Sequence, residues 1–153
     1  MSRNATSTFC TRSCNDEGDD VDPNRLTEHA DPAVRAGMTR RLEVLGDEYT
    51  LAAVESASPL AEDLQTWVTR DVWGGTWERD ALDRPSRSLI TIALLIAGGH
   101  EAELAAHVRG GLRNGLTSGQ ILEIVRHCAA YCGAPVALSA MRTVAAVLER
   151  EES

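Results

Sequence analysis

The sequence predicts an all-α protein, a compact helical domain of about six helices. Apolar residues recur at spacings of three and four along most of the chain, which is the period of an amphipathic helix. The β-branched residues follow the same helical spacing and do not alternate as they would in a strand. Capping residues precede the apolar stretches and glycines follow several of them, so most helix boundaries are marked in the sequence.

The first 30 residues do not share this pattern. They are rich in Ser, Thr, Asn and Asp and carry few large apolar side chains, a composition that cannot offset the entropy lost on ordering. We therefore predict a disordered acidic N-terminal tail over residues 1–30 and one domain over residues 31–153. The acidic run NDEGDD indicates a solvated surface, with binding of a partner as the alternative. The start of the chain lacks the apolar core of a signal peptide, so we expect a cytoplasmic protein.

Three helices are predicted in the first half of the domain. The first runs from Asp31 to Gly46, and a short helix follows within residues 48–56. The third begins at Ser58 and ends at the glycine pair 74–75. The apolar stripes of the first and third helices are Val34, Met38, Leu42 and Leu45, and then Leu60, Leu64, Trp67, Val68 and Val72.

The second half begins with a predicted helix over residues 84–97, capped by Asp83 and apolar on nearly every side. A helix of this kind is buried in the centre of a domain or between subunits. Thr117 and Gln120 have the spacing of a capping box at the start of a later helix. The last three helices are predicted over residues 100–115, 117–132 and 135–150.

The composition excludes several kinds of chemistry. All 15 basic residues are arginine, which excludes mechanisms that need a lysine amine, such as a Schiff base, lysine-anchored pyridoxal phosphate or a Walker A phosphate loop. The formal net charge is -8 and no basic stripe is present, which argues against binding of nucleic acid. No apolar run approaches the roughly 20 residues that span a bilayer.

Four cysteines raise the question of a redox or metal site. Cys128 and Cys132 are one residue further apart than a thioredoxin-type pair, and they come late in a helix, where the helix dipole does not lower a thiol pKa. Cys10 and Cys14 repeat this spacing in the tail, but structural zinc sites usually take their cysteines from short knuckles. We therefore interpret Cys128 and Cys132 as small core residues.

The predicted helix 100–115 carries a cluster that could perform chemistry. His100, Glu103 and His107 are spaced to share one face, and Glu103 could set the tautomer of His107 and raise its pKa. A solvated surface pair and a Zn²⁺ or Fe²⁺ site are the alternatives. The glycine pair 110–111 lies one turn further on and indicates that a helix or a ligand packs very close.

A second cluster surrounds the glycine pair 74–75. Trp73 and Trp77 bracket the pair, and a group of arginines follows, namely Arg79, Arg84 and Arg87. The cluster is either a hinge closed by an aromatic plug or a lid whose guanidinium groups bind an anion. The spacing does not distinguish these two readings.

Taken together, these stretches resemble the carboxymuconolactone decarboxylase family. The resemblance rests on the Trp–Gly–x–x–Trp stretch, the Arg–Ser–Leu–x–Thr–Ile–Ala–Leu run and the His–Val–Arg helix, all within residues 72–117, and on YCGAPVALSA at residues 131–140. It extends over residues 31–150. The combination of these motifs in this order is specific to the family.

The resemblance implies an alkyl hydroperoxide reductase D-like helical fold, assembled as a homo-oligomer that is typically a hexamer. The implied activity is a cofactor-free decarboxylation of a small dicarboxylate lactone. The reaction would convert 4-carboxymuconolactone to 3-oxoadipate enol-lactone in the protocatechuate branch of the β-ketoadipate pathway. Thiol peroxidases of the same superfamily have redox cysteines at the positions of His100 and Glu103, so the redox pair is missing here.

A mechanism that these residues could perform gives a role to each of them. We expect His107 to deliver a proton to the substrate and Glu103 to orient His107, with neither a metal nor a cofactor. The expected substrate-binding residues are Arg79, Arg87, Arg109, Trp73, Trp77 and His100. Two departures bear on the substrate: Arg142 stands where relatives often have a histidine, and Gln120 where they often have an acid.

Two alternative functions stay open. One is a family relative that acts on a different lactone or on a hydroperoxide. The other is a non-catalytic helical oligomerisation module that uses the acidic tail to bind a partner. A peroxidase would need reactive thiols, whereas a binding module would tolerate the loss of His107 and Arg87.

Overall fold

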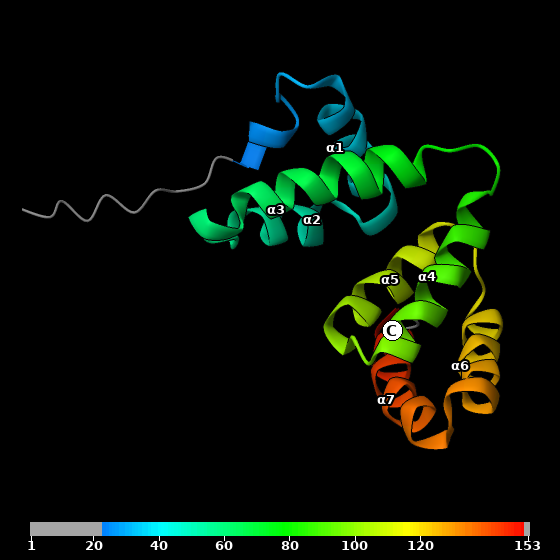
Figure 1. The fold of residues 1–153 in the computed structure, drawn as a ribbon. Helices are drawn as coiled ribbons and strands as arrows, with labels where there is room; N and C mark the ends of the chain where they lie inside the picture. Colours follow the sequence, from blue (N-terminus) through cyan, green and yellow to red (C-terminus); the bar gives the residue numbers. More distant parts are fainter. Residues whose placement is uncertain (1–22, 152–153) are drawn as a thin grey trace, which may run out of the picture.

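The computed structural model describes residues 23–151, and within this range every regular element is a helix. The N-terminal part consists of η1 (Pro23–Leu26), α1 (Pro32–Leu45), α2 (Asp47–Glu55), η2 (Pro59–Ala61), α3 (Glu62–Trp67) and the π-helix η3 (Val68–Trp77). The C-terminal bundle consists of α4 (Arg84–Gly98), α5 (Glu101–Arg113), α6 (Ser118–Cys132) and α7 (Ala134–Glu151). Figure 1 shows the two parts joined by the connection from η3 to α4. The all-α prediction is confirmed.

The predicted helix caps are present. The side chain of Asp31 accepts a hydrogen bond from the backbone N–H of Ala33 at 2.9 Å, and Asp83 accepts one from Ser86 at 2.8 Å. Thr117 and Gln120 form the reciprocal capping box at the start of α6. Each cap satisfies backbone donors that the first turn of a helix leaves free, so these boundaries are local properties of the sequence.

The helix that contains the glycine pair 74–75 does not end there, and this part of the prediction is wrong. The chain continues through both glycines as the π-helix η3, to Trp77. The reason is the close packing of η3 on α1. A Cβ atom at Gly37 would overlap the carbonyl oxygen of Thr69, and one at Gly74 would lie 2.6 Å from the carbonyl oxygen of Ala33. The glycines let the two backbones touch, and this tertiary contact outweighs their low helix propensity.

Residues just before the predicted boundary at residue 31 contact the helices. Leu26, in η1, is 1% exposed and packs in a cluster with Val34, Met38 and Val54. Arg25 makes an ion pair with Glu62. The described residues of the predicted tail therefore pack on the helical domain, while its residues 1–22 lie outside the described range.

The core of the C-terminal bundle is formed by apolar side chains of α4 to α7, among them Ile92, Ile96, Leu104, Val108, Ile121, Val125 and Val144. The close approach predicted at the glycine pair 110–111 is confirmed, and its partners are helices. A Cβ at Gly110 would lie 2.8 Å from the carbonyl oxygen of Val44, and one at Gly111 would lie 3.1 Å from Ile92 Cδ1. Through this contact α5 joins the bundle to α1.

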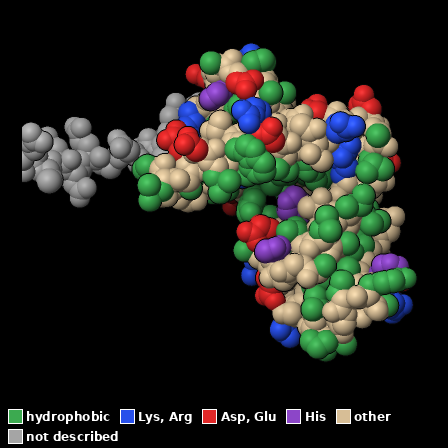
Figure 2. All heavy atoms as spheres, viewed as in Figure 1, with side chains coloured by type: hydrophobic (Ala, Val, Ile, Leu, Met, Phe, Trp, Pro, Cys, Tyr) green, Lys and Arg blue, Asp and Glu red, His purple; other side chains and the backbone are tan. Residues whose placement is uncertain are grey.

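Several predicted core residues are exposed in the single chain. In α4, Ile92 and Ile96 are buried, but Leu94 is 66% exposed, so the domain centre does not bury the whole helix. Burial between subunits, the other alternative given for this helix, stays a prediction. Part of the apolar stripe predicted for the third helix is also exposed, namely Leu60, Leu64 and Trp67. Figure 2 shows hydrophobic side chains at the surface of both parts of the molecule. No helix among residues 23–151 has the length and apolar character needed to cross a membrane.

Candidate active site

Three of the predicted site residues meet between η3 and α5. The ring of His107 lies nearly parallel to the indole of Trp73, with centroids 6.0 Å apart and an interplanar angle of 3°. Trp77 stacks on the same imidazole at 6.4 Å, and the two indoles stack on each other at 5.1 Å. Trp73 and Trp77 are buried, and His107 is partly buried. One face of η3 thus presents both indoles to a single histidine of α5.

The stack changes the acid–base behaviour of His107. The pKa of His107 is lowered from 6.5 to about 4, mainly by burial and, to a smaller extent, by the positive charge of Arg41. The carboxylate of Glu103 acts in the opposite direction and raises the pKa, but with the smallest effect of the three. The sequence-based expectation of a raised pKa is therefore wrong, because desolvation outweighs the i,i+4 carboxylate.

Arg41, in α1, is a charged residue of this region that the sequence reasoning missed. Its side chain is buried, with the residue 7% exposed, and Nη1 donates a hydrogen bond to Oε1 of Gln65 at 3.0 Å. Its Nε is enclosed and has no hydrogen-bond partner. Burial lowers the pKa of Arg41. The sequence contains one signal of this burial. Arg41 lies three residues after Met38 and four before Leu45, within the apolar stripe of the helix.

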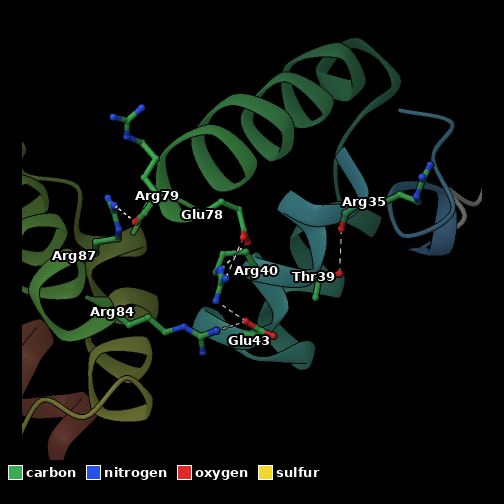
Figure 3. Close-up of polar contacts among 8 residues, drawn as sticks. All are labelled: Arg35, Thr39, Arg40, Glu43, Glu78, Arg79, Arg84 and Arg87. Atoms are coloured by element: carbon green, nitrogen blue, oxygen red, sulfur yellow. Dashed lines mark hydrogen bonds and ion pairs between the residues drawn. The ribbon is translucent and has the colours of Figure 1, made fainter. Parts of the chain in front are cut away.

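Arg40, the residue before Arg41, is surrounded by carboxylates. Arg40 donates hydrogen bonds to both carboxylate oxygens of Glu78, at 2.7 and 3.1 Å, and one to Glu43 at 2.8 Å. Arg84 also pairs with Glu43. Figure 3 shows this surface network between α1, the residue after η3 and the start of α4. Its carboxylates compensate the charge of Arg40, whereas none of the ion pairs among the described residues includes Arg41.

A cavity of about 190 Å³ opens beside the stack, lined by Thr76, Trp77, Leu82, Arg87, Ile90, Thr91 and Leu94. Nη2 of Arg87 donates a hydrogen bond to the backbone carbonyl of Arg79 at 2.5 Å, while Nε of Arg87 is enclosed without a partner. The side chain of Arg79 extends away from Arg87 (Figure 3). Arg87 is therefore the predicted arginine whose guanidinium faces a cavity next to an indole of the stack.

The other predicted residues, which lie elsewhere on α5 or at its start, take no part in the ring contacts of the stack. Glu103 is exposed one turn before His107. Arg109 is two residues beyond His107, a spacing that turns it to a different face of α5. His100 is the N-cap residue of α5 and lines a separate cavity of about 290 Å³ with residues that include Ser139 and Val136. Of the residues described, no three His, Cys, Asp or Glu side chains are arranged to hold a metal ion.

The two thiols of α6 lie away from the stack. Cys128 is buried against α4, with Sγ 3.9 Å from the carbonyl oxygen of Ala93, and burial raises its pKa. Its interpretation as a core residue is confirmed. Cys132 is exposed, so the same interpretation is wrong for Cys132. At their i,i+4 spacing the first thiol faces the core, and the second lies at the end of the helix, beyond the packed part of α6.

Comparison with known proteins identifies the family of this chain. Residues 62–146 match the model of the carboxymuconolactone decarboxylase family. The chain belongs to the carboxymuconolactone decarboxylase family. The resemblance inferred from the sequence is thus confirmed. The family match includes Trp73, Trp77, Arg87 and His107, and it begins after Arg41.

Two curated proteins that are similar to this chain have names that state an activity. The chain is 38% identical to 4-carboxymuconolactone decarboxylase of Acinetobacter baylyi over 107 residues, which is 70% of this chain and 80% of the relative. It is 42% identical to nitrosuccinic acid decarboxylase npaB of Metarhizium robertsii over 105 residues, which is 69% of this chain and 73% of the relative. Both named activities are decarboxylations of small acids.

Proposed function

We propose that this protein is a carboxy-lyase that converts 4-carboxymuconolactone to 3-oxoadipate enol-lactone without a cofactor, in the protocatechuate branch of the β-ketoadipate pathway. Family membership and two relatives named as decarboxylases support a carboxy-lyase. The observation that carries the proposal is the stack of His107 on Trp73 and Trp77, beside a cavity that Arg87 lines. The cytoplasmic location and the lack of a nucleic-acid partner remain predictions from the sequence.

The reaction needs two groups from the protein, one for the oxyanion and one for the proton. When the bond to CO₂ breaks, its electron pair forms a new ring double bond, the existing alkene shifts, and the lactone carbonyl becomes an oxyanion. The furan-like enolate then takes one proton on ring carbon. A buried cation or hydrogen-bond donor at the oxyanion and a proton donor at the carbon are therefore the two groups needed, and neither has to be lysine.

His107 is the proton donor in this proposal. The free protein holds its imidazole mostly neutral at neutral pH, because its pKa is about 4. A bound dianionic substrate brings negative charge next to the imidazole and raises its proton affinity, so that His107 becomes protonated in the complex. Glu103 supports the same protonated form through its charge.

Arg87 binds the carboxylate that the substrate retains. Its place in the cavity wall, beside the indole of Trp77, suits a carboxylate. The leaving carboxylate faces the apolar side of the cavity, formed by Leu82, Ile90 and Leu94. A salt bridge to the leaving group would stabilise the ground state and slow the loss of CO₂.

Nitrosuccinate is a second candidate substrate, favoured by the relative that is named for it. The two compounds share a reacting fragment: a carbon that loses its carboxylate, a neighbouring CH₂–COO⁻ arm, and an electron-accepting group, which is the unsaturated lactone in one and the nitro group in the other. The same proton donor and the same anchor for the arm serve both compounds.

A direct assay tests these proposals. 4-Carboxymuconolactone is unstable, so it is generated in the cuvette from its muconate precursor by a cycloisomerase, and enol-lactone formation is followed; nitrosuccinate is assayed in parallel. We expect turnover by the wild type and a loss of about 10²- to 10⁴-fold in kcat/KM for His107→Ala. Near-normal turnover by a folded His107→Ala protein would contradict the role of His107. A wild type inactive on both compounds would favour the non-catalytic module.

We also propose that the protein acts as a homo-oligomer, a hexamer by resemblance. The exposed apolar side chains of α4, namely Leu89, Ile90 and Leu94, support this, because a row of large apolar residues on one helix favours a subunit contact. Light scattering after size exclusion gives the mass. We expect Leu94→Glu to lower it, and a monomeric wild type would contradict the proposal.

A further inference from the structure

Arg41 has no structural partner that explains its burial. Among the described residues its guanidinium donates a hydrogen bond to a neutral amide, Gln65, and its Nε is enclosed without any acceptor. Thr69, across the contact between α1 and η3, is fully buried, and its Oγ1 also lacks a partner. Burying a cation without a carboxylate is costly, so the retention of Arg41 at this place calls for a functional explanation.

We propose that Arg41 is the cation that stabilises the oxyanion formed on the substrate when CO₂ leaves. This inference rests on the proposed function and assigns a catalytic residue to it. Arg41 keeps its proton throughout the reaction. The electron pair of the broken bond moves onto the lactone or nitro oxygen beside its guanidinium, and returns to carbon when His107 transfers its proton.

The position of Arg41 next to His107 carries the proposal. In both candidate substrates, the carbon that takes the proton is bonded directly to the atom that bears the oxyanion oxygen. The proton donor and the oxyanion partner must therefore lie side by side. Gly110 of α5 meets the carbonyl of Val44, and Arg113 donates a hydrogen bond to the carbonyl of Leu45, so α1 and α5 run in the same direction where they touch. Arg41 lies one turn before Val44 and His107 one turn before Gly110, which places the two side chains on neighbouring turns, and the charge of Arg41 acts on His107. Arg87 lies instead in the wall of the cavity with Trp77.

The electrostatics of the site agree with this geometry. The charged groups that act on His107 are Arg41 from α1 and Glu103 from its own helix, and Tyr49 of α2 acts on Arg41. The indoles of η3 carry no charge. A preorganised, desolvated cation is most effective where negative charge develops during the reaction, because no solvent has to reorganise.

Ligand binding tests the proposal without turnover. The probes are 3-nitropropanoate and its nitronate, freshly diluted from alkali; the nitronate carries the CH₂–COO⁻ arm and a charged electron acceptor, like the intermediate from nitrosuccinate. Quenching of tryptophan fluorescence reports binding. We expect the wild type to prefer the nitronate by about tenfold or more, Arg41→Met to lose this preference, and the matched control Arg40→Met to keep it. Equal preference in wild type and Arg41→Met would overturn the proposal.

Kinetics and NMR separate the possible roles. We expect Arg41→Met to lower kcat by about 10²- to 10³-fold with little change in KM, and Arg41→Lys to recover part of this loss. A higher KM with unchanged kcat would overturn the proposal in favour of simple carboxylate binding.

In ¹⁵N NMR titrations, the pKa of His107 should rise in Arg41→Met and stay unchanged in Arg40→Met. A pKa of His107 that Arg41→Met leaves unchanged would contradict the proximity of Arg41 and His107.

Failure of this inference and failure of the proposed function give different results. If the wild type decarboxylates neither compound but still prefers the nitronate through Arg41, the proposed function fails and the anion site stands. If the wild type is active and Arg41→Met keeps its kcat within about threefold, the function stands and the inference fails. Arg41→Met should fold with unchanged or higher stability, because it removes an uncompensated buried cation. A strongly destabilised Arg41→Met protein would indicate a structural role, which the folded Arg41→Lys variant tests independently.

Discussion

The low pKa of His107 predicts a specific loss of stability in acid. The imidazole titrates near pH 4 in the folded protein and near 6.5 when unfolded. Above pH 6.5 it is neutral in both states and contributes nothing. As the pH falls below 6.5, the unfolded state binds a proton that the folded state does not, so the free energy of unfolding decreases, and the effect levels off below pH 4. At pH 5 this single group lowers the stability by about 2 kcal/mol.

The assay is urea unfolding at pH 7.5 and at pH 5.0, at one fixed protein concentration. The measured quantity is the loss of unfolding free energy between the two pH values in the wild type, minus the same loss in His107→Gln, which cannot titrate. We expect a difference of about 2 kcal/mol. His127→Gln, at an exposed histidine of α6, is the matched control and should lose as much as the wild type.

A difference near zero would refute the reasoning, because it would mean that the imidazole is not desolvated by Trp73 and Trp77. A difference of opposite sign, with the variant losing more stability than the wild type, would mean that Glu103 dominates the site. That outcome would restore the expectation drawn from the i,i+4 spacing alone.

Three further predictions concern packing, capping and thiols. Gly37→Ala should destabilise the protein by about 3 kcal/mol in urea unfolding, because its Cβ would overlap the backbone of η3, whereas Gly119→Ala, whose Cβ would meet nothing closer than 3.9 Å, should change stability by less than about 1 kcal/mol. Thr117→Ala should cost about 1 kcal/mol through loss of the capping box, and an unchanged midpoint would contradict this. In a variant without the two N-terminal cysteines, a disulfide probe should react quickly with Cys132 and with Cys128 only after unfolding; fast reaction of both thiols would contradict the burial of Cys128.

Much of the fold was predictable because its signals act within one or two turns. Asp31, Asp83 and Thr117 satisfy backbone donors of their own helices, so the boundaries that they set need no tertiary information. The glycine pair 110–111 predicted a close approach and the structure supplied the partners, α1 and α4. The glycine pair 74–75 predicted a helix end, and failed, because contact with α1 carries the helix through it.

The sequence by itself determined most of the helices and the family, and it predicted three residues that meet in the candidate site, Trp73, Trp77 and His107, since their motifs are contiguous and specific. The tertiary structure decided the environment of each group. Arg40 and Arg41 are adjacent and chemically identical, yet one is paired at the surface and the other buried without a carboxylate. That distinction depends on where η3 crosses α1, and the pKa of His107 depends on the same crossing. Electrostatics follow distance and burial in space, which no local pattern records.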